Sequence, residues 1–198
     1  KESILGILKN PVFSSLFIII LVSSFGLQAF ESIYSIMATI NFGFTTNDIA
    51  LVITISGSLA LICQVFLFDW IVSKLGEMRL IQLTFFVSAT FIAVIAFTTS
   101  HLVVVLSTFV VFLSFDLFRP AVTTYLSKNG GNQQGAINGL NSTFTSFGNI
   151  LGPLAAGSLF DLNHFYPYYV SAMILLGTGF LSLFLTNMTS KKLLLKKS

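Results

Sequence analysis

Charged residues are scarce in this chain of 198 residues, of which Asp, Glu, Lys and Arg together make up 9%. Soluble globular proteins carry about 25% charged residues, because their surfaces must be hydrated. The deficit therefore excludes a water-exposed globular surface. In place of charge, the chain is 55% hydrophobic and contains 22 phenylalanines. Hydrocarbon is the solvent that suits this composition, so we expect an integral membrane protein.

Cysteine and histidine are nearly absent as well. Cys63 is the single cysteine, which excludes an intrachain disulfide and makes a zinc site implausible. The two histidines, His101 and His164, lie far apart in breaks between apolar runs. The sequence contains no nucleophile–base pair, no metal-ligand cluster and no phosphate-binding loop. We therefore expect neither an enzyme nor a bound metal or cofactor.

Long apolar runs fill most of the chain and predict its fold class. A membrane-spanning helix needs about 20 mostly apolar residues, and breaks rich in Gly, Asn, Asp and Lys separate the runs. We predict an all-α membrane protein, with a bundle of six transmembrane helices over residues 1–190. The six predicted spans are 12–38, 48–72, 79–99, 101–126, 136–160 and 165–187.

Positive charge is confined to one side of the predicted spans. Every Lys and Arg except Arg119 lies at a terminus or in the second or fourth loop, and the other three loops carry none. By the positive-inside rule, both termini are expected in the cytoplasm and the protein in the plasma membrane. The basic tail, 191–198, is interpreted as an anchor on anionic lipid rather than as a nucleic-acid site.

Three ionisable residues fall well inside spans, where a charge costs several kcal/mol and usually faces a cavity or a partner: Glu31, Asp116 and Arg119. Asp116 and Arg119 are three residues apart and share a helix face. Pro120 follows at once and frees a backbone carbonyl one turn earlier. One alternative is a buried ion pair that only fixes helix packing. Glu31 has no obvious basic partner, and its own alternative is a solvated position near the outer interface.

Polar and aromatic side chains follow the same helix faces and predict the lining of a cavity. Gln28 shares a face with Glu31. In the fifth span, residues with amide or hydroxyl groups recur every three or four positions, and Gly148-x-x-x-Gly152 with Pro153 indicates close helix approach and a bend. Phenylalanines are candidates for apolar walls that accept ring systems. The candidate lining residues are Gln28, Phe30, Phe112, Phe115, Asn138, Asn141, Phe144, Thr145, Phe147 and Asn149.

Several segments resemble the major facilitator superfamily. Six helices fit the 3+3 inverted repeat found within each half of those transporters. The loop 68–79 resembles a degenerate form of the superfamily's cytoplasmic loop motif, which Asp69, Gly76 and Arg79 match. The segments that closely resemble the carboxy-terminal half of the superfamily's quinolone and multidrug exporters are 24–31, 109–121 and 139–154.

This resemblance implies a drug:proton antiporter, driven by the proton gradient, that expels hydrophobic and often cationic drugs. It assigns protonation and substrate binding to Glu31 and Asp116, with Arg119 beside them. The family has twelve spans, so it also implies an amino-terminal six-helix half as partner, beside lipid, protons and drugs. The chain begins without Met, as the interior of a longer chain would. Two alternatives remain, an importer or metabolite carrier on the same scaffold, and a half-transporter that folds without transporting.

Overall fold

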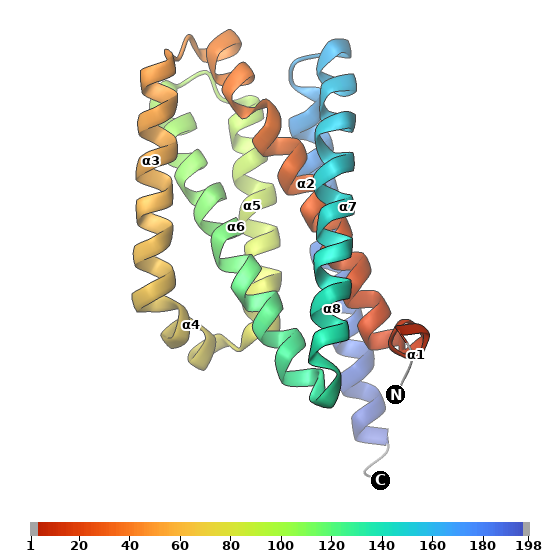
Figure 1. Cartoon of the computed structure of the whole chain (residues 1–198). Helices are drawn as coiled ribbons and strands as arrows, with labels where there is room; N and C mark the ends of the chain where they lie inside the picture. The colour runs from red at the N-terminus through yellow and green to blue at the C-terminus, as the bar shows by residue number, and fades with distance from the viewer. Residues whose placement is uncertain (1–3, 196–198) are drawn as a thin grey trace.

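The computed structural model describes residues 4–195, and these form helices joined by short connections (Figure 1). No β-strand occurs within residues 4–195, as an all-α protein requires. The side chains of the predicted basic tail, 191–198, lie outside the described part. The elements are α1 (Ile4–Lys9), α2 (Pro11–Phe42), α3 (Thr46–Ile62), a π-helical turn (Cys63–Leu67), α4 (Phe68–Leu75), α5 (Glu77–Phe97), α6 (His101–Asn129), a 3₁₀ turn (Gly131–Gln133), α7 (Gln134–Leu162) and α8 (Tyr166–Leu195).

Five long helical segments within the described residues are long and apolar enough to cross a membrane, which confirms the fold class of a multi-pass helical membrane protein. They are α2, α5, α6, the described part of α8, and the continuous run Thr46–Leu75 that joins α3 to α4. The fifth predicted span, 136–160, corresponds to α7, which is 29 residues long and is not among these five. Its amide, hydroxyl and glycine residues make it less apolar than the others, so a sixth crossing stays a prediction.

Local sequence signals explain where the helices begin and end. The Asn10 side chain accepts a hydrogen bond from the Val12 N–H at 3.0 Å and caps α2. Thr45 and Asp48 form a reciprocal capping box at the start of α3. Gly43 ends α2 with φ of 66°, a left-handed conformation that glycine adopts without strain.

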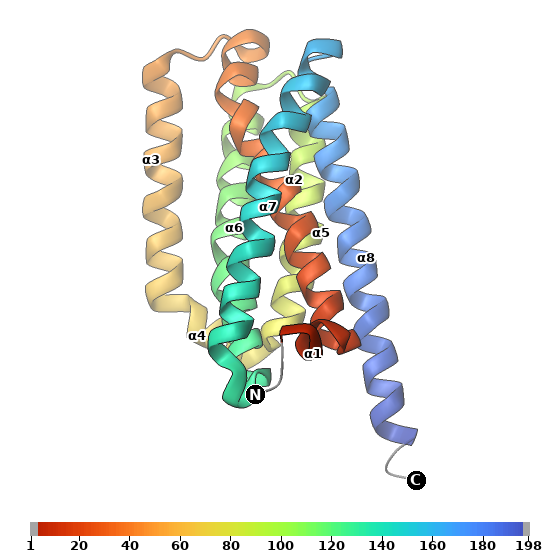
Figure 2. The same cartoon turned by 45° about the vertical axis from the view of Figure 1, so that its right-hand side comes forward.

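The long helices of the bundle pack against one another in pairs. The main packing pairs are α2 with α7 and α8, α5 with α6 and α8, and α3 with α6. If α2 is exchanged with α6, α3 with α7 and α5 with α8, the same set of pairs results. The pairs are thus consistent with the predicted inverted repeat. The segment containing α3 stands apart from the other helices in Figures 1 and 2, and only 22% of its apolar window is buried.

Helices α2 and α7 make the tightest backbone approach, through the two glycines that the sequence singled out. A Cβ placed on Gly148 would lie 2.7 Å from the Leu21 carbonyl oxygen and 2.8 Å from the Phe25 nitrogen. A Cβ on Gly152 would lie 2.7 Å from the Phe25 carbonyl oxygen. Any larger residue would force these backbones apart, so this GxxxG pair holds the two helices together.

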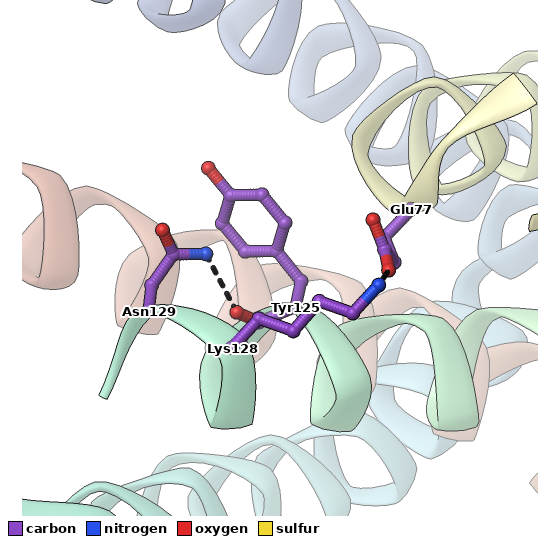
Figure 3. A network of polar contacts seen from close by, with 4 residues as sticks. All are labelled: Glu77, Tyr125, Lys128 and Asn129. Carbon is purple, nitrogen blue, oxygen red and sulfur yellow. Dashed lines mark hydrogen bonds and ion pairs between the residues drawn. The ribbon is translucent and has the colours of Figure 1, made fainter. Parts of the chain in front are cut away.

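The first and last described residues of the chain lie at the same end of the bundle, together with an ion pair. Figures 1 and 2 show α1, α4, the α6–α7 junction and the end of α8 at this end, as an even number of crossings requires. Lys128 near the end of α6 forms an ion pair with Glu77 at the start of α5 (Figure 3). In the same turn, the Asn129 amide donates to the Tyr125 carbonyl oxygen at 2.7 Å. The ion pair joins α5 to α6 at the end of the bundle where Lys9, Lys74 and Arg79 also lie, whereas the Asn129 bond stays within α6.

Candidate functional site

The two carboxylates that the sequence singled out line one pocket between α2, α3 and α6. Its volume is about 170 Å³. Glu31 enters it from α2, and Asp116 enters it from the middle of α6. Their spacing in the sequence does not predict a shared cavity. In the structure, the Phe30 ring of α2 contacts the Phe112 and Phe115 rings of α6, and the pocket lies beside this contact. The complete lining is Leu27, Glu31, Ile53, Ser56, Gly57, Phe112, Phe115, Asp116 and Arg119.

A second pocket of about 220 Å³ lies next to the first, between α2, α6 and α7. Leu27 and Arg119 line both pockets, so the two cavities adjoin. Three members of the predicted amide and hydroxyl stripe on α7 reach this second cavity, namely Asn141, Thr145 and Asn149. The joined cavities therefore present carboxylates at one end and amide groups at the other, with the Arg119 guanidinium between them.

Glu31 has an amide partner and no close cation. The Gln28 side-chain nitrogen donates to the Glu31 Oε2 at 3.3 Å, one helical turn away on the same face of α2. Within residues 4–195, no described Lys, Arg or His nitrogen lies within 4.0 Å of this carboxylate. Glu31 is exposed on the pocket side of α2, which leaves its second oxygen accessible. The pocket therefore contains a carboxylate without a cationic partner among the described residues.

Asp116 and Arg119 line the same pocket without forming a salt bridge. The ion pair found among the described residues joins Lys128 to Glu77 instead. Asp116 is half-buried, whereas Arg119 is exposed at the junction of the two cavities. The alternative of a buried ion pair that only fixes helix packing does not describe this structure. The Arg119 guanidinium lines the pocket and forms no salt bridge with Asp116.

The backbone of Asp116 has an unusual hydrogen bond. Pro120 lies inside α6 and supplies no N–H to the carbonyl four residues earlier, which is that of Asp116. The Gln64 side chain, from the π-helical turn that follows α3, donates to this oxygen at 3.4 Å. The sequence predicted the freed carbonyl, but it did not identify the residue that donates to it.

The predicted phenylalanine walls are only partly at the pocket. Phe112 and Phe115 line it, and their rings also contact Phe30. Phe30 is fully buried behind them and packs edge-on against Tyr168 at 5.2 Å. Phe30 therefore supports the wall from behind and does not face the cavity.

The other predicted lining residues lie outside these two cavities. Phe144 stacks on Phe17 at 5.3 Å, whereas Phe147 is 56% exposed on α7. Asn138 is also exposed on α7, nearer the α6–α7 junction. Gln28 reaches the site only through its hydrogen bond to Glu31. Their proposed contact with substrate stays a prediction.

The loop-motif residues lie at the end of the bundle that holds α1 and α4. Gly76 has φ of 79° between α4 and α5, a conformation that a larger residue adopts only with strain. Asp69 and Arg79 are exposed, and neither forms an ion pair within the described part of the chain. The charged contact at this turn is made by Glu77, the residue next to the glycine.

Helix α3 contributes pocket residues that the sequence interpretation missed. Ile53, Ser56 and Gly57 line the pocket opposite Asp116. Ser56 and Gly57 follow Ile53 by three and four positions, so the three share a helix face, and small residues on such a face are a signal for close helix packing or for space beside a ligand. The sequence does not mark this face, because the charged residues of the predicted span, Asp48 and Asp69, lie near its ends and the stretch between them is mostly apolar.

Comparisons with known proteins agree with the geometry. A family model described as Major Facilitator Superfamily matches residues 11–197. The crystal structure of the human organic anion transporter MFSD10 (TETRAN) superposes with a TM-score of 0.79 at 15% sequence identity, over 90% of this chain and 44% of that one. This likeness concerns the fold alone.

Sequence relatives are found among bacterial drug-resistance proteins. The chain is 47% identical to Multidrug resistance protein 2 of Bacillus subtilis over 167 residues, which cover 84% of this chain and 42% of that protein. It is 39% identical to Quinolone resistance protein NorA of Staphylococcus aureus over 160 residues, covering 81% and 41%. The chain thus spans about two fifths of the length of the curated relatives it matches. Since the family model covers nearly the whole chain and the fold agrees, the chain belongs to the Major Facilitator Superfamily.

Proposed function

We propose that this chain is the carboxy-terminal half of a proton-coupled multidrug efflux transporter, which exports hydrophobic and cationic compounds such as quinolones and dyes. The observation that carries the proposal is the pocket shared by Glu31 and Asp116, with aromatic walls and, among the described residues, no cation within 4.0 Å of either carboxylate. Relatives named for multidrug and quinolone resistance support the substrate class. This function is transport, and no enzymatic step is involved.

The pocket can bind a lipophilic cation through two kinds of contact. Glu31 and Asp116 attract the charge, in surroundings whose low dielectric strengthens the attraction. The Phe112 and Phe115 rings offer apolar surface and π-faces to ring systems and ammonium groups. Shape requirements are weak on such a surface, which suits a varied set of drugs.

Proton coupling follows if protons and drug compete for the same carboxylates. A proton on Glu31 or Asp116 removes the charge that holds a cation and so lowers the affinity for the drug. The coupling is reciprocal, because bound drug disfavours protonation by the same free energy. Uptake of protons from the outside would release drug there, and loss of protons inside would restore the site.

The pocket supplies one wall of a transport pathway. Alternating access in this superfamily requires two bundles that rock about a central site. Glu31 and Arg119 are exposed in this structure, and so are Phe147 and Leu154 on α7. Six further helices would cover this side. We therefore expect no transport by this chain alone. We also propose that the chain lies in the plasma membrane, with both termini and the basic loops on the cytoplasmic side.

The experiment is ethidium efflux from cells that express this chain with the amino-terminal half of Bacillus subtilis Multidrug resistance protein 2. The expected result is efflux that a protonophore abolishes, with none from either half alone. Glu31→Gln and Asp116→Asn should each remove it at unchanged membrane expression. Efflux that persists in both variants would contradict the carboxylate site. Accumulation driven by the gradient, in place of efflux, would indicate an importer.

A further inference from the structure

Pro120 creates a backbone defect at the position of the pocket carboxylate. In an uninterrupted α-helix, the N–H of residue 120 would donate to the carbonyl of residue 116. Proline has no N–H, and a carbonyl left without a donor inside a bilayer costs several kcal/mol. The carbonyl concerned belongs to Asp116, whose side chain lines the pocket. Its hydrogen-bond donor therefore bears directly on the position of that carboxylate.

Gln64 supplies the donor from the neighbouring segment. Its side-chain amide lies 3.4 Å from the Asp116 carbonyl oxygen, across the contact between the end of α3 and α6. Within the described residues, it is the side-chain hydrogen bond that connects the segment Thr46–Leu75 to α6. Elsewhere on this segment, Ser56 and Ser58 donate only to carbonyls of their own helix.

The local backbone at Gln64 departs from α-helical geometry. Residues Cys63–Leu67 form a π-helical turn between α3 and α4. Such turns insert an extra residue, change the direction in which side chains point, and occur often at functional sites. One face of α3 meets α6. It carries the pocket-lining residues Ile53, Ser56 and Gly57, then Ala60, and leads along the chain toward Gln64.

The weak burial of α3 makes this hydrogen bond consequential. Only 22% of the apolar window of Thr46–Leu75 is buried in the bundle, against 39% or more for the other four apolar spans. A segment with so few packing contacts can move relative to its neighbours at low cost. A specific polar contact near one end would fix the separation between α3 and α6, and with it the width of the pocket between them.

We propose that Gln64 is a positioning residue for the drug and proton site. By donating to the carbonyl that Pro120 leaves free, it holds α3 against the proline bend of α6 and sets where the Asp116 carboxyl lies in the pocket. The part of this inference that concerns drug binding rests on the proposed function. The structural link between Gln64 and Pro120 does not depend on a drug.

The test is a double-variant cycle on the whole chain in lipid nanodiscs, with Gln64→Leu, Pro120→Ala and their combination. Pro120→Ala restores the N–H to the Asp116 carbonyl, so it should make Gln64 dispensable. Gln64→Leu should lower the thermal unfolding midpoint in the Pro120 chain and leave it unchanged in the Pro120→Ala chain. Ser58→Ala serves as control, because that hydroxyl bonds only within its helix. Gln64→Asn repeats the test with a polar side chain that is one methylene shorter and should not reach the Asp116 carbonyl oxygen.

Ethidium binding provides the readout that a purely structural role would not change. Gln64→Leu should weaken ethidium binding about threefold, the fold-change that matches a typical interhelical hydrogen bond in a membrane. It should also shift the pH at which ethidium is released, and both changes should vanish in the Pro120→Ala background. Equal losses in both backgrounds, or none in the Pro120 chain, would overturn the proposal. If the unaltered chain binds no ethidium without its six-helix partner, the unfolding cycle decides the role of Gln64, and the efflux experiment decides the proposed function.

Discussion

Glu31 of α2 and Asp116 of α6 face one pocket, and neither has a cation within 4.0 Å among the residues that the structure describes. Both side chains present their carboxyl groups to the same cavity, beside the Phe112 and Phe115 rings. The nearest basic side chain, Arg119, remains exposed between the two cavities. The arrangement differs from a closed structural ion pair, and the proposed function assigns it to a positively charged ligand.

The glycine contact between α2 and α7 predicts a large effect from the smallest possible substitution. Gly148→Ala places a methyl group 2.7 Å from the Leu21 carbonyl oxygen and should cost about 1–3 kcal/mol of unfolding free energy. Gly157→Ala on the same helix meets nothing within 4 Å and serves as control. It should be neutral or slightly stabilising. Unfolding in a mild denaturing detergent measures both, and equal behaviour of the two variants would contradict the predicted contact.

The ion pair between α5 and α6 should contribute little and should respond to salt. Lys128 is 63% exposed in this pair, so Lys128→Met should lower the unfolding free energy by only about 0.2–1 kcal/mol. The loss should shrink at high ionic strength, because salt screens exposed charges. Lys74→Met is the matched control, since Lys74 is exposed and forms no ion pair within residues 4–195. A loss from Lys128→Met that does not change with salt would argue against an electrostatic contribution.

A buried hydroxyl without a hydrogen bond predicts a stabilising substitution. Tyr168 is fully buried, and its hydroxyl has no hydrogen-bond partner among the described residues. Burying an unsatisfied polar group costs about 1–3 kcal/mol. Tyr168→Phe should therefore leave the unfolding free energy unchanged or raise it by about 1 kcal/mol, as thermal unfolding would show. Tyr166→Phe, at an exposed position, should have no effect. A clear loss of stability in Tyr168→Phe would mean that the hydroxyl is satisfied after all.

The α3 wall of the pocket can be altered without disturbing the core. A Cβ on Gly57 meets nothing within 4 Å, although Gly57 lines the pocket opposite Asp116. Gly57→Leu should fill part of the cavity of about 170 Å³ and weaken ethidium binding while the unfolding midpoint is kept. Gly57→Ala should have a much smaller effect on binding. Unchanged ethidium affinity in Gly57→Leu would place the drug elsewhere.

Hydropathy and charge predicted the fold class and the residues at the centre of the site, for clear physical reasons. An ionisable group inside an apolar span is costly, so Glu31 and Asp116 stood out without any structure. Gly148 and Gly152 likewise indicated a close helix contact, and α7 packs there on α2.

The other features of the site depend on how each helix is rotated and tilted in the bundle. The local sequence of a single helix does not determine this. Phe30 carries the same local signal as Phe112, yet it is fully buried behind the pocket wall while Phe112 lines it. The apolar span of α3 offered no charge to mark its pocket-facing side. Pro120 predicts a carbonyl in need of a donor, but Gln64 is identified as that donor only when the end of α3 is placed beside α6.

Ethidium binding to the chain in lipid nanodiscs, measured from pH 8 to pH 5, tests most directly whether protons and cationic drugs compete for Glu31 and Asp116. The predicted result is an affinity that falls as the pH falls, because protonation removes the charges that attract the cation. In the Glu31→Gln, Asp116→Asn double variant, the affinity should be low and independent of pH. An affinity that does not vary with pH in the unaltered chain, or that varies equally in the double variant, would contradict the proposed competition.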